Sequence, residues 1–193
     1  MTDPRRAAVL EEARSWLGTP YHHMGRVKGV GCDCLTLLAA VYHAAGVVPE
    51  IEIPHYPPDW HLHRSAELYL EGLGAFAREI ILPPLQLPPQ AGGEQETAAA
   101  PALLRDAGAG SEDAIADLVQ AGDVALFRFG RCFSHGAIVV DWPTVIHAWH
   151  VGGVMLTDVK QPLLVSRPVR FFSPFPALPP SLPCERGWAR EGA

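Results

Sequence analysis

Cys34 is the residue of this chain best placed for nucleophilic chemistry. It follows Gly31-Cys32-Asp33 and begins an apolar segment that we expect to be helical. At a helix start, unpaired backbone N–H groups and the helix dipole favour a negative charge. A thiolate placed there has a lowered pKa and can act as a nucleophile near neutral pH. The rest of the chain must then supply a base, an orienting group and a substrate groove.

Two histidines far along the chain are candidates for the base and the orienting group. A cysteine nucleophile needs a nearby base, and that base needs a third group to fix its orientation. His135 begins one predicted strand and His147 lies within the next. Their side chains are neighbours only if they project from the same face of the sheet. A contact between His135 and His147 therefore predicts a loop of odd length or a β-bulge near Trp142-Pro143.

The N-terminal part of the chain is predicted to be helical and to position Cys34. Apolar residues recur at helical spacing over 7–17, and Gly18 can end that helix in a left-handed conformation. A second apolar stripe runs over 34–45, with Gly46 as its stop. Burial of this second helix would hold its first turn rigidly, which a nucleophile requires.

The second half of the chain changes to the pattern of strands. Predicted strands, separated by turn signals, cover 124–129, 136–140, 145–149, 154–159 and 169–172. Helices followed by an antiparallel meander predict an α+β fold. We expect N-terminal helices, with the nucleophile at a helix N-terminus, packed on a C-terminal antiparallel sheet of about five strands.

Composition limits the classes of function. The chain has 193 residues, 48% hydrophobic and 19% charged, which is typical of a single globular domain. A net charge of −6 argues against binding to nucleic acid. No apolar run is long enough for a membrane span. Glu11, Glu12 and Arg14 interrupt any secretory h-region, so we expect synthesis in the cytoplasm without a standard export signal.

Two segments stand apart from the predicted core. Residues 49–120 form an insertion between the helices and the strands, in which 91–110 is predicted to be mobile. Within it we expect a helix capped by Ser65 and continuing to Ile80, and a short helix over 111–118. Residues 176–193 form an irregular Pro-rich tail that contains Cys184. The domain itself is expected to cover 1–175.

Five short motifs occur in a particular order. They are Gly18-Thr19-Pro20-Tyr21, Asp33-Cys34, Gly122-Asp123-Val124, Ser134-His135-Gly136-Ala137-Ile138 and Ile146-His147-Ala148. In this order the motifs resemble the NlpC-type cell-wall peptidases, which are small papain-like cysteine enzymes. The resemblance extends over residues 7–48 and 119–160, roughly half the chain.

The resemblance implies a role for each of five residues. Cys34 would be the nucleophile, His135 the general base and His147 the orienting residue, with no metal and no organic cofactor. Tyr21 would lie against the cysteine and help bind the substrate or the oxyanion. Asp33 would help hold the amino end of the substrate. The family cleaves the stem peptides of peptidoglycan, commonly between D-glutamate and a diamino acid.

The expected absence of an export signal fits phage-type or tail-associated members of that family. The predicted partners are therefore peptidoglycan stem peptides and proteins of a phage tail or tail-like particle, which would deliver the enzyme to the cell wall.

The chain departs from the family pattern near the groove. The family usually has Ser-Gly directly after the cysteine, where this chain has Leu35-Thr36. An aromatic residue and a glycine usually follow the tyrosine by two and three positions, where His23 and Met24 stand here. These changes bear on the choice of substrate more than on the triad.

Two alternatives use the same residues differently. Cys32 and Cys34 with Cys132 and His135 could form a structural zinc site of the Cys₃His kind, although this leaves His147 unexplained. The chain could also be a structural tail protein with a vestigial peptidase site.

Several other residues receive no catalytic role. His55, His61 and His63 are interpreted as solvated residues of the insertion. His150 is expected to face away from His147 because of its odd offset. Cys32 is interpreted as a loop residue beside the site. Packing is expected for the tryptophans, which are Trp60, Trp142 and Trp149.

Overall fold

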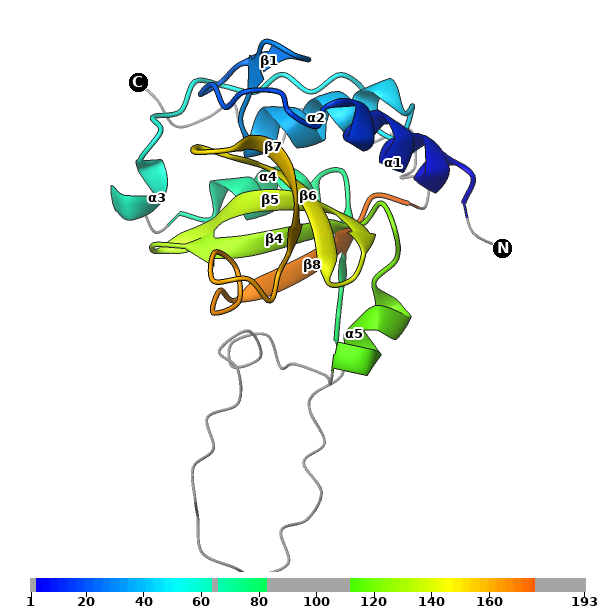
Figure 1. The fold of residues 1–193 in the computed structure, drawn as a ribbon. Coiled ribbons are helices and arrows are strands. Elements are labelled where there is room, and N and C mark those ends of the chain that lie inside the picture. Colours follow the sequence, from blue (N-terminus) through cyan, green and yellow to red (C-terminus); the bar gives the residue numbers. More distant parts are fainter. Residues whose placement is uncertain (1–2, 64–65, 83–111, 176–193) are drawn as a thin grey trace, which may run out of the picture.

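The computed structural model describes residues 3–63, 66–82 and 112–175 (Figure 1). The predicted mobile loop at 91–110, the predicted tail at 176–193 with Cys184, and the predicted cap at Ser65 lie outside these ranges. Among the described residues, no helix has the length and apolar character needed to cross a membrane.

The two predicted N-terminal helices are confirmed as α1 (Arg5–Ser15) and α2 (Cys34–Ala44). Gly18 and Gly46 follow them with φ of 82° and 67°, the left-handed conformation expected at these helix ends. Both helices lie on the same side of the sheet (Figure 1). Between them, β1 (Arg26–Val27) and β2 (Gly31–Cys32) form a short antiparallel ribbon that leads into α2.

The main sheet is antiparallel and has six strands in the order β3-β8-β4-β5-β6-β7. The five predicted strands are confirmed, and their bounds are β4 (Val124–Phe129), β5 (Cys132–Asp141), β6 (Thr144–Trp149), β7 (Gly153–Asp158) and β8 (Val169–Ser173). The sixth strand, β3 (Arg78–Ile80), pairs with β8 at one edge.

Strand β3 lies where the sequence predicted the end of a helix, so that part of the prediction is wrong. The observed helix α4 (Leu68–Gly74) is short. Gly72 and Gly74 weaken a helix, and pairing with β8 gives the backbone of the following residues another set of hydrogen bonds. Two further helices complete the inserted region: α3 (Trp60–His63) was not predicted, whereas α5 (Glu112–Leu118) agrees with the predicted helix over 111–118.

Both faces of the sheet are covered. On one face, α2 buries Leu37, Leu38 and Val41 in a cluster that includes Ile138 and Ile146 from the sheet. Complete burial of one such side chain contributes roughly 1.5–3 kcal/mol. The opposite face forms a second cluster, whose largest fully buried members are Phe127, Phe171 and Leu164. The sheet and α2 therefore form a rigid support for the residue at the start of α2.

A buried ion pair attaches α1 to the start of β4. Nη1 of Arg6 lies 2.9 Å from Oδ1 of Asp123 and donates to the carbonyl of Ala121 at 2.7 Å. The second carboxylate oxygen of Asp123 accepts from the backbone N–H of Gln120 at 2.8 Å. The motif Gly122-Asp123-Val124 thus has a structural role in this chain.

Candidate active site

Cys34 is the first residue of α2, and Asp33 caps that helix. Oδ1 of Asp33 accepts from the backbone N–H groups of Leu35 at 3.2 Å and Thr36 at 2.9 Å. The Thr36 hydroxyl in turn accepts from the backbone N–H of Asp33 at 2.9 Å, which completes a capping box. Thr36, one of the residues that departs from the family pattern, therefore helps to fix the position of Cys34.

The Cys34 thiol lies against the first part of β5. Its Sγ donates to the carbonyl oxygen of Ser134, the residue before His135, at 3.8 Å. Burial, with a smaller contribution from the charge of Asp33, raises the pKa of Cys34 to about 12. The lowered thiol pKa predicted from the helix N-terminus is therefore wrong, because burial outweighs the backbone N–H groups that favour the thiolate. The resting thiol is protonated at neutral pH.

His135 and His147 are hydrogen-bonded to each other. Nε2 of His135 lies 2.7 Å from Nδ1 of His147, and Nε2 of His147 lies 2.9 Å from Oγ1 of Thr157. All three side chains are buried, with His147 fully enclosed. The result is a chain of hydrogen bonds that runs from β5 through β6 to β7 and fixes the orientation of both rings.

The contact between the histidines depends on an irregularity in the sheet. Val139 pairs with Val145, whereas Asp141 pairs with Thr144, so the register shifts by one residue at Val140. The turn between the strands contains only Trp142-Pro143. A turn of even length would place the histidines on opposite faces, and the bulge restores a common face. The predicted β-bulge is thus confirmed.

Both histidines are neutral at neutral pH. Burial lowers the pKa of His147 to about 4. Burial also lowers the pKa of His135 well below its usual value of 6.5, with smaller effects from the nearby His147, His61 and His150. A neutral imidazole can accept a proton, and Nε2 of His135 is already engaged by His147. Nδ1 is therefore the nitrogen through which His135 can act on a group in the pocket.

Cys34 and His135 line one pocket of about 390 Å³ together with Tyr21 and Asp33. His147 lies behind His135. The other residues of the pocket wall are mainly aromatic rings and imidazoles, namely His23, Leu35, Tyr56, Pro58, Trp60, His61, Leu68, Tyr69, Phe129, Ser134, Trp149 and His150.

Aromatic side chains pack against the His135 ring. The ring centroids of Phe129 and Trp149 lie 5.3 and 5.4 Å from that of His135, and both contacts are edge-on. Trp149 therefore packs as expected, but against the candidate base. His150 also lines the pocket, because it follows the last residue of β6 and no longer obeys the alternation of the strand.

The inserted segment forms one side of the pocket, which sequence reasoning missed. Tyr56 donates from its hydroxyl to Oδ2 of Asp33 at 2.5 Å. The hydroxyl of Tyr69 donates to the backbone carbonyl of Cys34 at 3.4 Å. A Cβ on Gly136 would lie 2.1 Å from that hydroxyl, so only glycine fits at this position of the motif. Tyr56 belongs to no motif or periodic segment, and Tyr69 lies in a predicted helix that gives no sign of a contact with Cys34.

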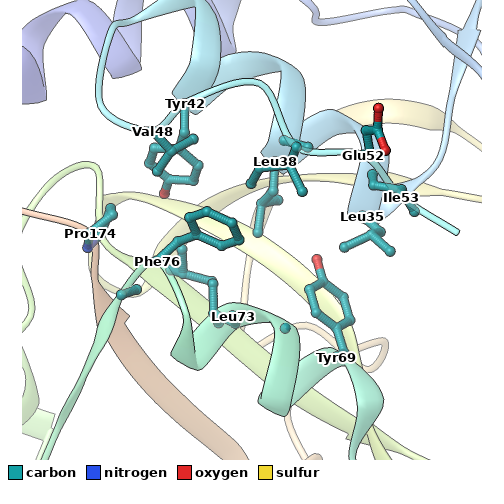
Figure 2. A pocket seen from close by; sticks show the side chains of 15 residues that line it. Leu35, Leu38, Tyr42, Val48, Glu52, Ile53, Tyr69, Leu73, Phe76 and Pro174 are labelled. Carbon is teal, nitrogen blue, oxygen red and sulfur yellow. The ribbon is translucent and has the colours of Figure 1, made fainter. Parts of the chain in front are cut away.

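A smaller cavity of about 60 Å³ lies between α2 and the inserted segment (Figure 2). Leu38 and Tyr42 of α2 face Leu73 and Phe76 across it, and Leu35 and Tyr69 line both this cavity and the larger pocket. Its wall is almost wholly apolar, so the cavity is expected to be dry.

The structure describes all four residues of the zinc alternative, and they do not come together as a metal site. Cys32 and Cys132 are buried free cysteines. No group of three or more histidine, cysteine or acidic side chains among the described residues could hold a metal ion. The zinc alternative therefore lacks a site in this part of the chain.

Comparisons with known proteins identify the fold. No family model and no curated protein matches the sequence. The chain is similar to a lipoprotein-like protein of the NLP/P60 family from Staphylococcus aureus subsp. aureus Mu50, with a TM-score of 0.50 and 18% identity over 88% of this chain. It is also similar to the NlpC/p60 domain of the peptidoglycan hydrolase SagA, with a TM-score of 0.44 and 19% identity over 86% of this chain and 96% of that one. A third similar structure is NlpC1 from Trichomonas vaginalis, with a TM-score of 0.47 and 15% identity over 89% of this chain and 44% of that one.

The Staphylococcus protein is much longer than this chain, which covers 42% of it. At such low identity, the similarity establishes a common fold. The predicted α+β class is confirmed: N-terminal helices pack on a C-terminal antiparallel sheet of six strands in an NLP/P60-like fold.

Proposed function

We propose that this protein is a cysteine peptidase that hydrolyses amide bonds in the stem peptides of peptidoglycan. The observation that carries the proposal is the hydrogen-bonded pair of His135 and His147 in the same site as Cys34, at the start of a capped helix. The NLP/P60-like fold and the order of the five motifs support the same conclusion.

Acylation of Cys34 would be the first chemical step. His135 takes the thiol proton through Nδ1 as Sγ of Cys34 attacks the carbonyl carbon of the substrate. The C–N bond then breaks, and the imidazolium of His135 protonates the departing amine. A thioester on Cys34 remains, and the amine product leaves the groove.

Hydrolysis of the thioester would restore the enzyme. His135 removes a proton from a water molecule, whose oxygen attacks the thioester carbonyl. The C–S bond breaks, the carboxylic acid product leaves, and His135 returns the proton to the sulfur. Because the pKa of Cys34 is raised, the thiolate forms during attack and does not persist in the resting site.

His147 and Thr157 would keep His135 in the tautomer that this mechanism needs. In that tautomer Nε2–H of His135 donates to Nδ1 of His147, whose Nε2–H donates to the Thr157 hydroxyl. Nδ1 of His135 then carries the lone pair that accepts the proton. His147 is therefore a positioning residue and not a proton acceptor.

Tyr21 and the first turn of α2 would stabilise the oxyanion. The backbone N–H of Cys34 belongs to the unpaired groups at a helix start. Burial, followed by the charges of Cys34 and Asp33, raises the pKa of Tyr21 to about 12, so its hydroxyl stays protonated and can donate. Tyr21 lines the pocket beside Cys34.

The choice of cleaved bond and the route to the cell wall rest on the resemblance in sequence. We propose that the cleaved bond joins D-glutamate to a diamino acid and that a phage or phage-like particle delivers the enzyme to the wall. The competing proposal, a structural tail protein with a vestigial site, predicts no turnover.

Digestion of purified peptidoglycan tests the proposed activity. Wild-type protein is expected to release stem-peptide fragments with a new amino terminus on the diamino acid, identified by mass spectrometry. The Cys34→Ala variant, matched for folding by circular dichroism, is expected to release none above background. Equal release by the two proteins would reject the peptidase and favour the structural role.

A further inference from the structure

A second β-bulge lies directly before His135. In β5, Phe133 and His135 pair with consecutive residues of β4, so the register skips Ser134. A bulge leaves backbone groups without a partner in the strand ladder, and bulges next to active sites often re-aim a side chain. In this bulge the carbonyl of Ser134 accepts from the Cys34 thiol at 3.8 Å. The irregular part of β5 therefore carries the candidate base and contacts the candidate nucleophile.

Glu67, which directly precedes α4, fixes the backbone on one side of this bulge. Its Oε2 accepts from the backbone N–H of Phe133 at 2.8 Å. A hydrogen bond to a carboxylate is about twice as strong as one between neutral groups. The two residues lie 66 positions apart in the sequence, so this bond attaches the inserted segment to the strand that carries His135.

Tyr69 of α4 fixes the backbone on the other side of the bulge. Its hydroxyl occupies the space beside Gly136, and it also donates to the backbone carbonyl of Cys34 at 3.4 Å. Figure 2 shows the ring of Tyr69 reaching from α4 toward the first turn of α2, where Leu35 lies. Only 3% of Tyr69 is exposed, and a side chain in a closely packed interior does not move without disturbing its neighbours. Tyr69 therefore sets the separation between the start of α2 and β5.

The backbone at Gly136 also acts on the thiol itself. Burial and the charge of Asp33 raise the pKa of Cys34, whereas hydrogen bonds with backbone groups, that of Gly136 first, lower it. A shift of β5 would weaken this contact and would move the ring of His135 at the same time. Catalytic groups must be held within about 0.5 Å of their productive geometry, and a misplacement of about 1 Å can cost about 10²-fold in rate.

We propose that Glu67 and Tyr69 form a clamp on β5 and that both are positioning residues of the proposed peptidase. By holding β5 on both sides of its bulge, the clamp keeps His135 at its working distance from Cys34. Neither clamp residue takes part in the chemistry, because both act through the backbone of β5 and α2. The inserted segment thus contributes to the rate although none of its groups reacts. This inference rests on the proposed function, since it concerns the same site.

Substitution of Glu67 tests the clamp through the separate effects on kcat and KM. Glu67→Met keeps the length of the side chain but removes the acceptor for the N–H of Phe133. We expect kcat on a stem peptide to fall by about 10-fold with KM unchanged, because the base is displaced while the groove is kept. Glu67→Gln keeps an acceptor oxygen and is expected to recover most of the loss. A Gln variant as impaired as the Met variant, or a Met variant with the kcat of wild type, would overturn the proposal.

Tyr69→Phe removes the hydroxyl beside Gly136, and Tyr42→Phe is its matched control. The Tyr42 hydroxyl is also buried and donates to a backbone carbonyl, that of Gly122 at 2.9 Å, but it lies outside the active-site pocket. Both variants lose one buried hydrogen bond, so we expect similar losses of thermal stability. Only Tyr69→Phe is expected to lower kcat, by about 5-fold. A kcat that falls equally in both variants, or in neither, would reject the clamp at Tyr69.

Alkylation of Cys34 separates this proposal from the proposed function. Labelling by iodoacetamide at neutral pH needs the base in position but no cleavage of a peptide. Glu67→Met, checked for folding by circular dichroism, is expected to slow the labelling by about 10-fold, and Tyr69→Phe provides the same test if that variant does not fold. Slowed labelling, with no release of stem peptides by wild type, would support the clamp and reject the hydrolysis. Cleavage by wild type, with labelling and kcat unchanged in the variant, would reject the clamp alone.

Discussion

The two sides of the candidate site are built in different ways. The catalytic side consists of the first turn of α2 and three neighbouring strands, which hold Cys34, His135, His147 and Thr157 through a helix cap and through strand pairing with a bulge at Val140. The groove side consists of the loop before α2 and the inserted segment, which meet at the hydrogen bond between Tyr56 and Asp33. Regular elements fix a geometry closely, whereas irregular segments vary without loss of the core. The proposed chemistry thus resides in the scaffold, whereas the insertion forms one wall of the groove.

Removal of the proposed base, which lies on the catalytic side, is expected to have the largest effect on activity. His135→Ala removes the proposed proton acceptor, and general acid–base catalysis typically contributes 10²–10⁴-fold. We expect kcat/KM on a stem peptide to fall by about 10³-fold, with little change in KM. Steady-state kinetics gives both values. A loss confined to KM would instead assign His135 to substrate binding.

The support of the catalytic side should depend on the buried pair of Arg6 and Asp123. Asp123→Ala leaves the Arg6 charge buried and uncompensated, which typically costs 3–5 kcal/mol. We expect the free energy of unfolding in urea to fall by about that amount. Lys28→Met, which breaks the surface pair with Glu12, is the control and should cost at most about 1 kcal/mol. Equal losses in the two variants would contradict the structural role given to Asp123.

Stability should fall in acid because of the paired histidines. In the unfolded chain His147 has its ordinary pKa of 6.5, and burial lowers this to about 4 in the folded protein. Below pH 6.5 the unfolded state therefore binds more protons, so folding stability is complete above that pH and is lost progressively toward pH 4. The expected loss is on the order of a few kcal/mol. Urea titrations between pH 7 and pH 4 measure it, and His147→Gln should flatten the profile.

Much of the catalytic side could be predicted from the sequence. Alternation in the strands places His135 and His147 on one face only with a loop of odd length or a bulge near Trp142-Pro143, and a bulge is present at Val140. Thr157 could also have been found, since it lies two residues beyond Met155, the cross-strand partner of His147. The raised pKa of Cys34 could not, because helix position reveals the dipole but not the depth of burial.

The groove side could not be predicted in the same way. Tyr56 lies in an irregular segment without periodicity, and its contact with Asp33 spans 23 residues. The sequence pattern predicts a helix at β3, because the pairing of β3 with β8 is a tertiary interaction that local sequence does not encode. The sequence shows how long the insertion is, but it does not show that residues of the insertion line the pocket.

The smallest expected effect concerns the far end of the hydrogen-bonded chain. Thr157→Val removes the partner of His147 Nε2 while keeping a similar shape. Losing one partner of a buried hydrogen bond costs about 1–3 kcal/mol, and we expect kcat/KM to fall by about 10-fold. Thr157→Ser keeps the hydroxyl and should restore most of the activity. If the serine variant is as impaired as the valine variant, packing and not orientation explains the role of Thr157.

Alkylation of the cysteines tests most directly whether Cys34 is a nucleophile served by His135. Iodoacetamide is applied to native wild-type protein at neutral pH, and mass spectrometry measures the labelling rate at each cysteine. Cys34 is the only partly exposed cysteine among the described residues, while Cys32 and Cys132 are buried. We predict that Cys34 is labelled before Cys32 and Cys132 and that His135→Ala slows its labelling by at least about 10-fold, because the base that removes the thiol proton is lost. Faster labelling of Cys32 or Cys132, or a Cys34 rate that is unaffected by His135→Ala, would contradict the account.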